Sequence, residues 1–248
     1  MLWEYAEEKR GAREFALPRL PITNGLWLPA DKALCVGLAN DRGLLINAQN
    51  VHLVESNGQL YTEMVRNTIK IPNRRPYIGE LTKLKFVHKL DYAYLDFLGG
   101  MNKHNVPWIA TEFSENLTVD ATVCITQMLS PRNNPIFSKQ DSLLRTEAGE
   151  WIRNVYGVTE LRIQRILMLL HRIFRKWRFR LVGKNGSVYS YSDSVSTMLL
   201  LKLQKFQEAS KEHQTLFPEI GHDSFIRGSE LVSQSKKTRR TKSGNQKA

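Results

Sequence analysis

The chain has 248 residues, of which 42% are hydrophobic, so it can bury a sizeable core as one large domain or two small ones. It has no apolar run long enough to span a membrane, and its acidic residues 1–8 lack the apolar core of a signal peptide. Its two cysteines, Cys35 and Cys124, lie far apart and match no metal-ligand spacing. These features argue against a membrane-spanning or secreted protein and favour a reduced, cytoplasmic compartment.

The net charge of +12 is segregated along the chain. Residues 1–130 hold as many Lys and Arg as Asp and Glu, so the whole excess lies in residues 131–248. Solubility alone would not require this segregation, and a polyanionic partner for the second half is its simplest cause. An acidic protein surface or a membrane surface stays open as the partner.

The first elements in chain order are a helix and a hairpin. Residues 6–13 are expected to form a short helix, and three prolines then break regular structure. Trp27 and Leu28 are expected in the core. Residues 50–55 and 59–65 are rich in β-forming residues and flank Asn57-Gly58, the strongest short signal for a β-hairpin. The sequence therefore predicts a hairpin here.

The rest of the first half predicts a helix and a strand. Residues 68–76 are expected to be a solvated loop, and residues 81–101 a helix that stops at Gly99-Gly100. Residues 106–111 are expected to form a short apolar strand. Hairpin, helix and strand in this order indicate a mixed α/β layer. Residues 130–140 are polar and proline-containing, and mark a domain boundary.

Residues 159–191 have the pattern of a winged helix-turn-helix. Apolar residues recur at helical spacing over residues 159–177, and Gly157 with Thr159 marks the preceding turn. The expected DNA-binding residues are Arg162, Arg165, Arg172 and Lys176 on a second face of this helix, with Lys184 in the turn that follows. Two strands, residues 179–182 and 187–191, would form the wing around this turn. The alternative is a core helix with a solvated basic face.

Three units follow from this reading. Residues 1–130 form a first domain, and residues 131–228 a winged-helix domain that includes a helix over residues 194–209. Residues 229–248 form a basic tail that is too polar to fold alone.

The stretch His104-Asn105-Val106-Pro107-Trp108-Ile109-Ala110-Thr111-Glu112 carries a resemblance to a known family. Together with residues 13–18, the predicted hairpin and the winged helix, it resembles the TnsA-type endonuclease subunit of heteromeric transposons. The resemblance covers most of residues 13–191. It implies an α/β fold with a restriction-endonuclease-like mixed sheet domain, followed by a winged-helix domain and a basic disordered tail.

The resemblance also implies chemistry and partners. In the family a Glu, an Asp and a Gln-x-Lys pair hold Mg²⁺ and cut the 5′ strand at transposon ends. The implied partners are double-stranded DNA of the transposon ends, a TnsB-like DDE transposase and a TnsC-like regulatory ATPase. The implied location is bacterial, cytoplasmic and associated with the nucleoid.

The sequence departs from the family at the catalytic positions. The expected aspartate falls at about Val51, and the acids of the hairpin are Glu55 and Glu63 at most. Glu8 could stand for the family's helix glutamate, but so could Glu4 or Glu7. A hard cation needs several converging carboxylates. The nuclease site is therefore expected to be degraded, with Glu8 and Glu63 as its weak candidates, no assigned metal ligand, and Mg²⁺ as cofactor only if the site is active.

The function expected from these observations is a TnsA-like DNA-binding subunit of a transposition machine. Two alternatives are an active Mg²⁺-dependent endonuclease that cuts 5′ strands at transposon ends, and a winged-helix DNA-binding regulator or replication initiator.

Overall fold

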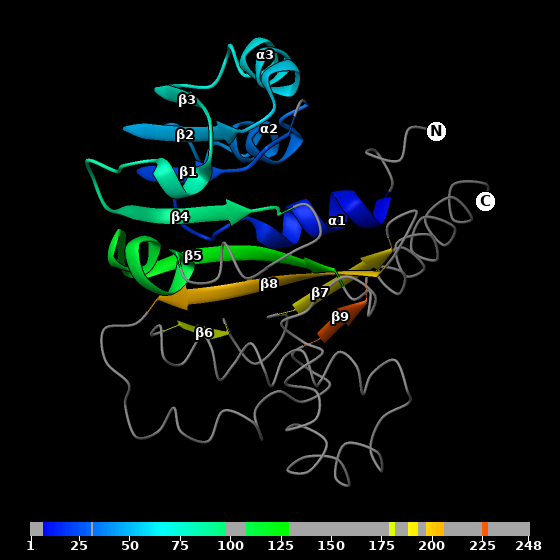
Figure 1. Cartoon of the computed structure of the whole chain (residues 1–248). Helices are drawn as coiled ribbons and strands as arrows, with labels where there is room; N and C mark the ends of the chain where they lie inside the picture. The colour runs from blue at the N-terminus through cyan, green and yellow to red at the C-terminus, as the bar shows by residue number, and fades with distance from the viewer. Residues whose placement is uncertain are drawn as a thin grey trace, which may run out of the picture.

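The described strands form one mixed sheet (Figure 1). The computed structural model describes residues 7–30, 32–97, 108–128, 179–181, 188–192, 197–205 and 225–227. The strands are β1 (Asn24–Trp27), β2 (Asn50–Glu55), β3 (Arg74–Ile78), β4 (Leu90–Leu95), β5 (Leu117–Met128), β6 (Phe179–Leu181), β7 (Val188–Ser192), β8 (Thr197–Lys205) and β9 (Phe225–Arg227). The helices are α1 (Glu7–Ala16), α2 (Leu34–Asp41), α3 (Gly58–Asn67), the 3₁₀ turn η2 (Leu81–Lys83) and the π-helical turn η3 (Ile109–Phe113).

The strand order is β3-β2-β1-β4-β5-β8-β7-β9, with β6 paired to β8 beside this path. Strands β1 to β5 pair with one another in parallel, and β8 runs antiparallel between β5 and β7. In Figure 1 the sheet runs from β3 at the top to β9 at the bottom. Pro76 lies in the edge strand β3, where a missing N–H is tolerated and discourages pairing with another chain.

Each face of the sheet has its own hydrophobic core. Side chains alternate along β1, so Leu26 belongs to one core and Trp27 to the other. Helices α1, α2 and α3 cover the Trp27 face, for example through Ala12, Val36 and Met64. The turns η2 and η3 and the segments around them cover the Leu26 face.

The C-terminal turn of α1 is held by side chains from two strands. Tyr92 Oη of β4 donates to the carbonyl of Ala16 at 3.2 Å. Lys202 Nζ of β8 donates to the carbonyls of Phe15 at 2.9 Å and Leu17 at 2.6 Å. A helix end leaves such carbonyls without partners of its own, so these bonds fix α1 to the sheet.

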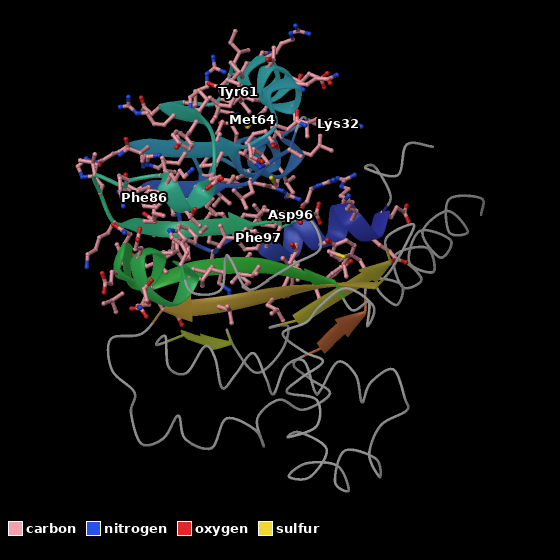
Figure 2. All side chains as sticks on the ribbon, viewed as in Figure 1. Lys32, Tyr61, Met64, Phe86, Asp96 and Phe97 are labelled. Atoms are coloured by element: carbon pink, nitrogen blue, oxygen red, sulfur yellow. The ribbon has the colours of Figure 1, made fainter. Side chains whose placement is uncertain are left out.

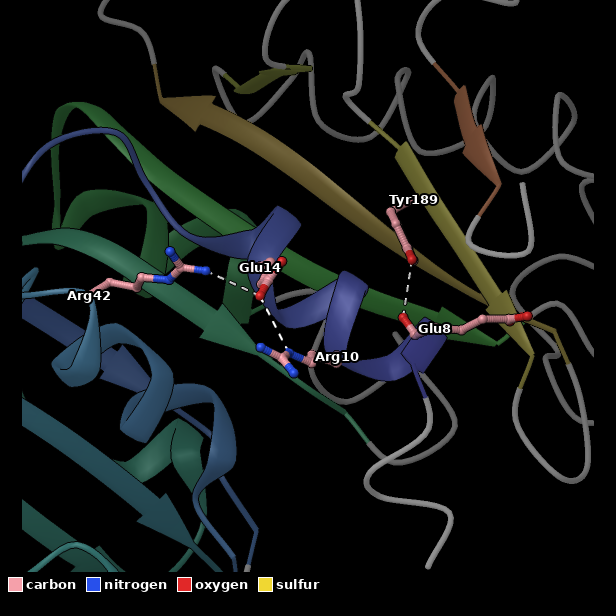
Figure 3. Close-up of polar contacts among 5 residues, drawn as sticks. All are labelled: Glu8, Arg10, Glu14, Arg42 and Tyr189. Carbon is pink, nitrogen blue, oxygen red and sulfur yellow. Dashed lines mark hydrogen bonds and ion pairs between the residues drawn. The ribbon is translucent and has the colours of Figure 1, made fainter. Parts of the chain in front are cut away.

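The N-terminal part of α1 contacts β7 (Figure 3). Tyr189 Oη donates to the carbonyl of Glu8 at 3.2 Å. Gly11 permits this approach, because a Cβ there would lie 2.4 Å from Tyr189 Oη. The ion pair of Glu14 with Arg42 at 3.3 Å is partly exposed and contributes little to stability.

The hairpin predicted over residues 50–65 is wrong in its second half. Residues 50–55 form β2 as expected, but the next element is the helix α3. Asn57 Oδ1 accepts the N–H groups of Gln59 at 2.9 Å and Leu60 at 3.2 Å, which is helix N-capping. Asn-Gly favours a hairpin turn, but Asn also favours a helix start, and here the cap prevails.

Two further predictions in the first half are wrong. In place of a helix over residues 81–101 the structure has η2 and then β4. In place of a strand over residues 106–111, Trp108 begins the helical turn that continues into η3. Strand β4 is buried on both faces, as parallel strands are, so it lacks the alternation of polar residues by which a strand is identified.

The predicted wing exists as strands but not as a hairpin. Strand β6 pairs with β8 at Arg180↔Gln204, and β7 pairs with β8 at Ser190↔Leu199. The helix predicted over residues 194–209 is wrong, because Thr197–Lys205 is β8. Strands β6 and β7 are therefore neighbours of a third strand rather than of each other.

Strands on both sides of the predicted boundary share the sheet. Strand β5 pairs with β8 from Thr122↔Gln204 to Met128↔Met198. The bounds of the predicted units 1–130, 131–228 and 229–248, and the basic tail itself, lie outside the described residues and stay predictions. No helix among the described residues has the length and apolarity needed to cross a membrane.

Candidate functional site

The strand order contains one topological switch point within its parallel part. From β1 the chain proceeds to β2 and β3 on one side, and later to β4 and β5 on the other. In open α/β sheets ligands bind outside the carboxyl ends of the strands at such a point. The candidate site is therefore the edge formed by the carboxyl ends of β1, β2 and β4.

The loop between β1 and α2 has a glycine-like backbone without glycine. Ala30 and Ala33 have φ angles of 51° and 50°, in the left-handed region that an alanine adopts at a cost of about 1–2 kcal/mol. Ala33 is the N-cap of α2 and makes no side-chain capping bond. Ala33 thus offers no side-chain cap to the first N–H groups of α2, and a helix start of this kind favours an anionic group.

The strain of this loop can be tested by stability measurements. Ala30 is exposed, so Ala30→Gly is expected to raise the free energy of unfolding by roughly 0.5–1 kcal/mol by removing the left-handed penalty. Ala12→Gly, in the middle of α1, is expected to lower it by about 1 kcal/mol. Denaturant unfolding of both variants checks the prediction, and a destabilised Ala30→Gly would contradict it.

Glu55 lies at the carboxyl end of β2. The register Trp27↔Leu53 places it level with Pro29 in the β1–α2 loop. Its Oε1 accepts the N–H of Asn57 at 2.8 Å, and its backbone carbonyl accepts the N–H of Gly79 at 3.0 Å. A carboxylate has about four acceptor sites, so further hydrogen bonds can be accepted from a ligand.

Asp96 lies at the carboxyl end of β4, on the other side of β1 (Figure 2). Thr126 Oγ1, at the end of β5, donates to Asp96 Oδ1 at 2.8 Å, and Thr126 is fully buried. The register Trp27↔Tyr94 puts Asp96 level with Pro29 as well. Asp96 and Glu55 thus flank the loop on strands about 10 Å apart, two strand spacings. Phe97 follows and packs against the Leu26 core.

Cys35, the second residue of α2, is not a nucleophile at this edge. Burial raises the pKa of its thiol to about 12, and the charge of Asp96 adds to the effect. Burial also raises the pKa of Tyr94 well above its ordinary value, again with a contribution from Asp96. Both side chains therefore stay neutral at physiological pH and carry no charge at this edge.

The catalytic residues predicted from the sequence do not lie together in the structure. Glu8 is on α1 and Glu63 is on α3, and the described residues contain no group of three or more His, Cys, Asp or Glu that could hold a metal ion. The predicted DNA-binding residues lie outside the described residues, so their role stays a prediction; they are Arg162, Arg165, Arg172, Lys176 and Lys184.

Sequence reasoning missed Asp96 altogether and considered Glu55 only as a possible metal ligand. The signal was present, since Asp96 directly follows the apolar run 92–95, and Glu55 follows residues 51–54, which are apolar except for His52. The helix predicted over residues 81–101 hid this signal for Asp96, because Asp96 has no special position in such a helix.

No protein-family model and no curated protein matches the sequence. Solved structures do match the fold. An N-methyltransferase, NodS from Bradyrhizobium japonicum WM9, solved with S-adenosyl-L-homocysteine, matches with a TM-score of 0.52 at 9% identity, over 82% of this chain and 90% of its own. A candidate RNA methyltransferase from Pyrococcus horikoshii matches with a TM-score of 0.50 at 11% identity, over 84% of this chain and 91% of its own. The fold is that of the Rossmann-like methyltransferases.

A protein described as a hemolysin from Streptococcus thermophilus matches with a TM-score of 0.55 at 12% identity, over 94% of this chain and 74% of its own. At these identities the likeness concerns the fold alone.

These matches correct the function inferred from the sequence. The fold class of a restriction-endonuclease-like domain with a winged helix is wrong, and so is the resemblance to TnsA-type endonucleases. Because the resemblance is wrong, the predicted role in transposition is wrong as well. The two alternatives, an active Mg²⁺-dependent endonuclease and a winged-helix regulator or replication initiator, are also without support. The partners inferred with that role, transposon-end DNA, a transposase and an ATPase, are likewise unsupported.

Proposed function

We propose that this chain is an S-adenosylmethionine-dependent methyltransferase that binds its cofactor at the carboxyl ends of β1, β2 and β4. The observation that carries the proposal is the pair of carboxylates, Glu55 and Asp96, on either side of the β1–α2 loop at the switch point. The methyltransferase fold of the solved neighbours supports it. A cytoplasmic location is part of the proposal, in keeping with the two free, buried cysteines.

The donor set of this edge fits the cofactor. The ribose has two hydroxyl donors, and Glu55 retains acceptor sites beside the one that Asn57 uses. The amino acid part carries a carboxylate, and the start of α2, where Ala33 offers no side-chain cap, favours an anion. The loop departs from a glycine-rich fingerprint, but Ala30 and Ala33 adopt backbone angles for which glycine is usually required.

The cofactor, when bound, supplies an electrophilic methyl group. The chain's own contribution is to orient the attacking atom and to manage its proton. Asp96 is suited to accept a hydrogen bond from an N–H or O–H nucleophile, and the buried hydroxyl of Thr126 restricts the orientation of its carboxylate. Phe97, packed into the core beside it, gives this part of the edge an apolar wall that limits water.

Cofactor binding is the direct test. Titration calorimetry of the full chain with S-adenosylhomocysteine is expected to detect binding, and Glu55→Gln is expected to weaken it about 10- to 100-fold. The reason is the loss of hydrogen bonds to a charged acceptor, worth about 1.5–3 kcal/mol. Glu63→Gln on α3 removes the same charge away from the edge and should leave the Kd unchanged. If the unaltered chain gives no binding heat, the proposal fails.

A further inference from the structure

Basic side chains gather on the Leu26 face of the sheet and in the segment that leads into β4, away from the candidate cofactor site. His52 of β2 and Arg75 of β3 are register partners and therefore point to the same face. The His52 ring meets the Phe86 ring edge-on, with centroids 5.4 Å apart. His88 and Lys89 follow Phe86 in the segment that leads into β4. We call His52, Arg75, His88 and Lys89 the β3 cation cluster.

His52, Arg75 and His88 lie within electrostatic reach of one another, and Lys89 is the sequence neighbour of His88. Burial lowers the pKa of His52, and the charges of Arg75 and His88 lower it further. His52 is consequently neutral at physiological pH and serves as a hydrogen-bonding group. The full positive charges of the cluster are those of Arg75 and Lys89, whose side chains are exposed.

Neighbouring basic residues are neutralised, but those of the cluster are not. Lys83 pairs with Glu80 at 3.2 Å and Lys85 pairs with Glu112 at 3.4 Å. Within the described part of the chain, no carboxylate lies within ion-pair distance of Arg75.

The same holds for His88 and Lys89. Arg74, the neighbour of Arg75, points to the opposite face, where its Nη1 bonds to the Val65 carbonyl of α3 and to Thr68 Oγ1. Arg74 thus has a structural role, whereas the described residues give the Arg75 side chain no hydrogen bond or ion pair.

Aromatic and apolar side chains lie among these cations. Tyr77 follows Arg75 by two residues on the same face of β3, and it is partly buried, like Phe86. Val87 is 89% exposed. Cations interleaved with aromatic rings are typical of surfaces that hold single-stranded nucleic acid, because phosphates meet the charges while bases stack on the rings. An acidic peptide would use the charges but not the rings.

We propose that the β3 cation cluster binds the phosphates of single-stranded RNA, with Phe86 and Tyr77 available for base contacts. This deepens the proposed function by naming the substrate class, and it rests on that proposed function. RNA binding at the cluster requires no cofactor, so it can be measured separately from cofactor binding.

The test is fluorescence anisotropy of the full chain with a labelled single-stranded RNA of mixed sequence, over a series of salt concentrations. Arg75→Gln/Lys89→Gln is expected to weaken binding at least 10-fold at 0.1 M salt. It should also lower the slope of log affinity against log salt by about 1.4, since each phosphate contact on a single strand contributes about 0.7. The matched control is Arg66→Gln/Lys70→Gln, which removes one Arg and one Lys from the exposed surface at α3.

Equal affinities for the cluster variant and the control variant would overturn the proposal. The proposal would also be overturned if a glutamate-rich peptide or anionic vesicles bound to the chain and the RNA did not bind measurably. Circular dichroism and thermal melting of both variants establish that each is folded. Cofactor titration of the unaltered chain separates the two proposals, because failure of one assay leaves the result of the other unaffected.

Discussion

Replacing Lys202 by methionine is expected to lower the free energy of unfolding by about 2–4 kcal/mol. Lys202 Nζ donates to the carbonyls of Phe15 and Leu17, and both would be left unpaired beside the sheet. Relief from burying a charged amine offsets part of this loss. Denaturant unfolding of the variant checks the value. Lys70→Met, at an exposed lysine, should change stability by less than 0.5 kcal/mol, roughly the range of surface substitutions.

The stability difference should also depend on pH. Burial lowers the pKa of Lys202 from its ordinary value of 10.5, the charge of Cys124 opposes this, and Arg19 lowers it further. A base whose pKa is lowered on folding binds its proton more tightly in the unfolded chain, so its contribution to stability grows as pH rises through the folded pKa toward 10.5. The difference between the unaltered chain and Lys202→Met should therefore widen from neutral pH to pH 10.5. A difference that narrows over this range would contradict the inferred burial.

Local residue patterns in the sequence correctly predicted some of the helices and strands. The helix over residues 6–13 is present as α1, and Trp27 is fully buried as expected. Strand β6 lies within the predicted range 179–182, and β7 overlaps the predicted range 187–191 and extends one residue beyond it. The sequence did not predict how these two strands pair. Their common partner is β8, which follows them in the chain and lies where a helix was predicted.

The apolar run of β8 explains this error. Residues 198–203 include Met198, Leu199, Leu200, Leu201 and Leu203, and leucine and methionine favour helices. In the structure Leu200 and Leu201 enter opposite cores because β8 is central and covered on both faces. Tertiary burial overrides the local propensity here.

The misleading resemblance has a physical cause as well. Trp108, in the stretch taken as a family signature, stacks on Phe113 with ring centroids 4.9 Å apart, and both are buried in the Leu26 core. The tryptophan of this stretch is therefore explained by packing around η3. The carboxylates of the candidate site were missed for a related reason, since a switch point exists only once the strand order is known.

Gly25→Ala is expected to destabilise the chain by about 3 kcal/mol or more. Gly25 lies in β1 between its partners Val51 and Tyr92, and a Cβ there would lie 2.3 Å from the Trp27 ring and 3.0 Å from Ile22. Neither neighbour can yield, because both are buried and the Trp27 ring packs against Tyr92. Overpacking of this kind displaces backbone as well as side chains.

Gly37→Ala provides the matched control for Gly25→Ala. Gly37 lies in α2, and a Cβ there would meet nothing within 4 Å. Alanine is the better helix former and restricts the unfolded chain, so this variant is expected to gain about 0.4–1 kcal/mol. Thermal or denaturant unfolding of the two glycine variants should therefore shift in opposite directions.

A double-mutant cycle with Trp27→Phe identifies the clash as the cause. The smaller ring vacates the position of the atoms nearest to the new Cβ, so Gly25→Ala should cost at least about 1 kcal/mol less in the Trp27→Phe background. Trp27→Phe also removes an indole N–H that is buried without a hydrogen-bond partner among the described residues, which limits its own cost. Additive losses would show that Gly25 is required by the backbone of β1 rather than by the tryptophan.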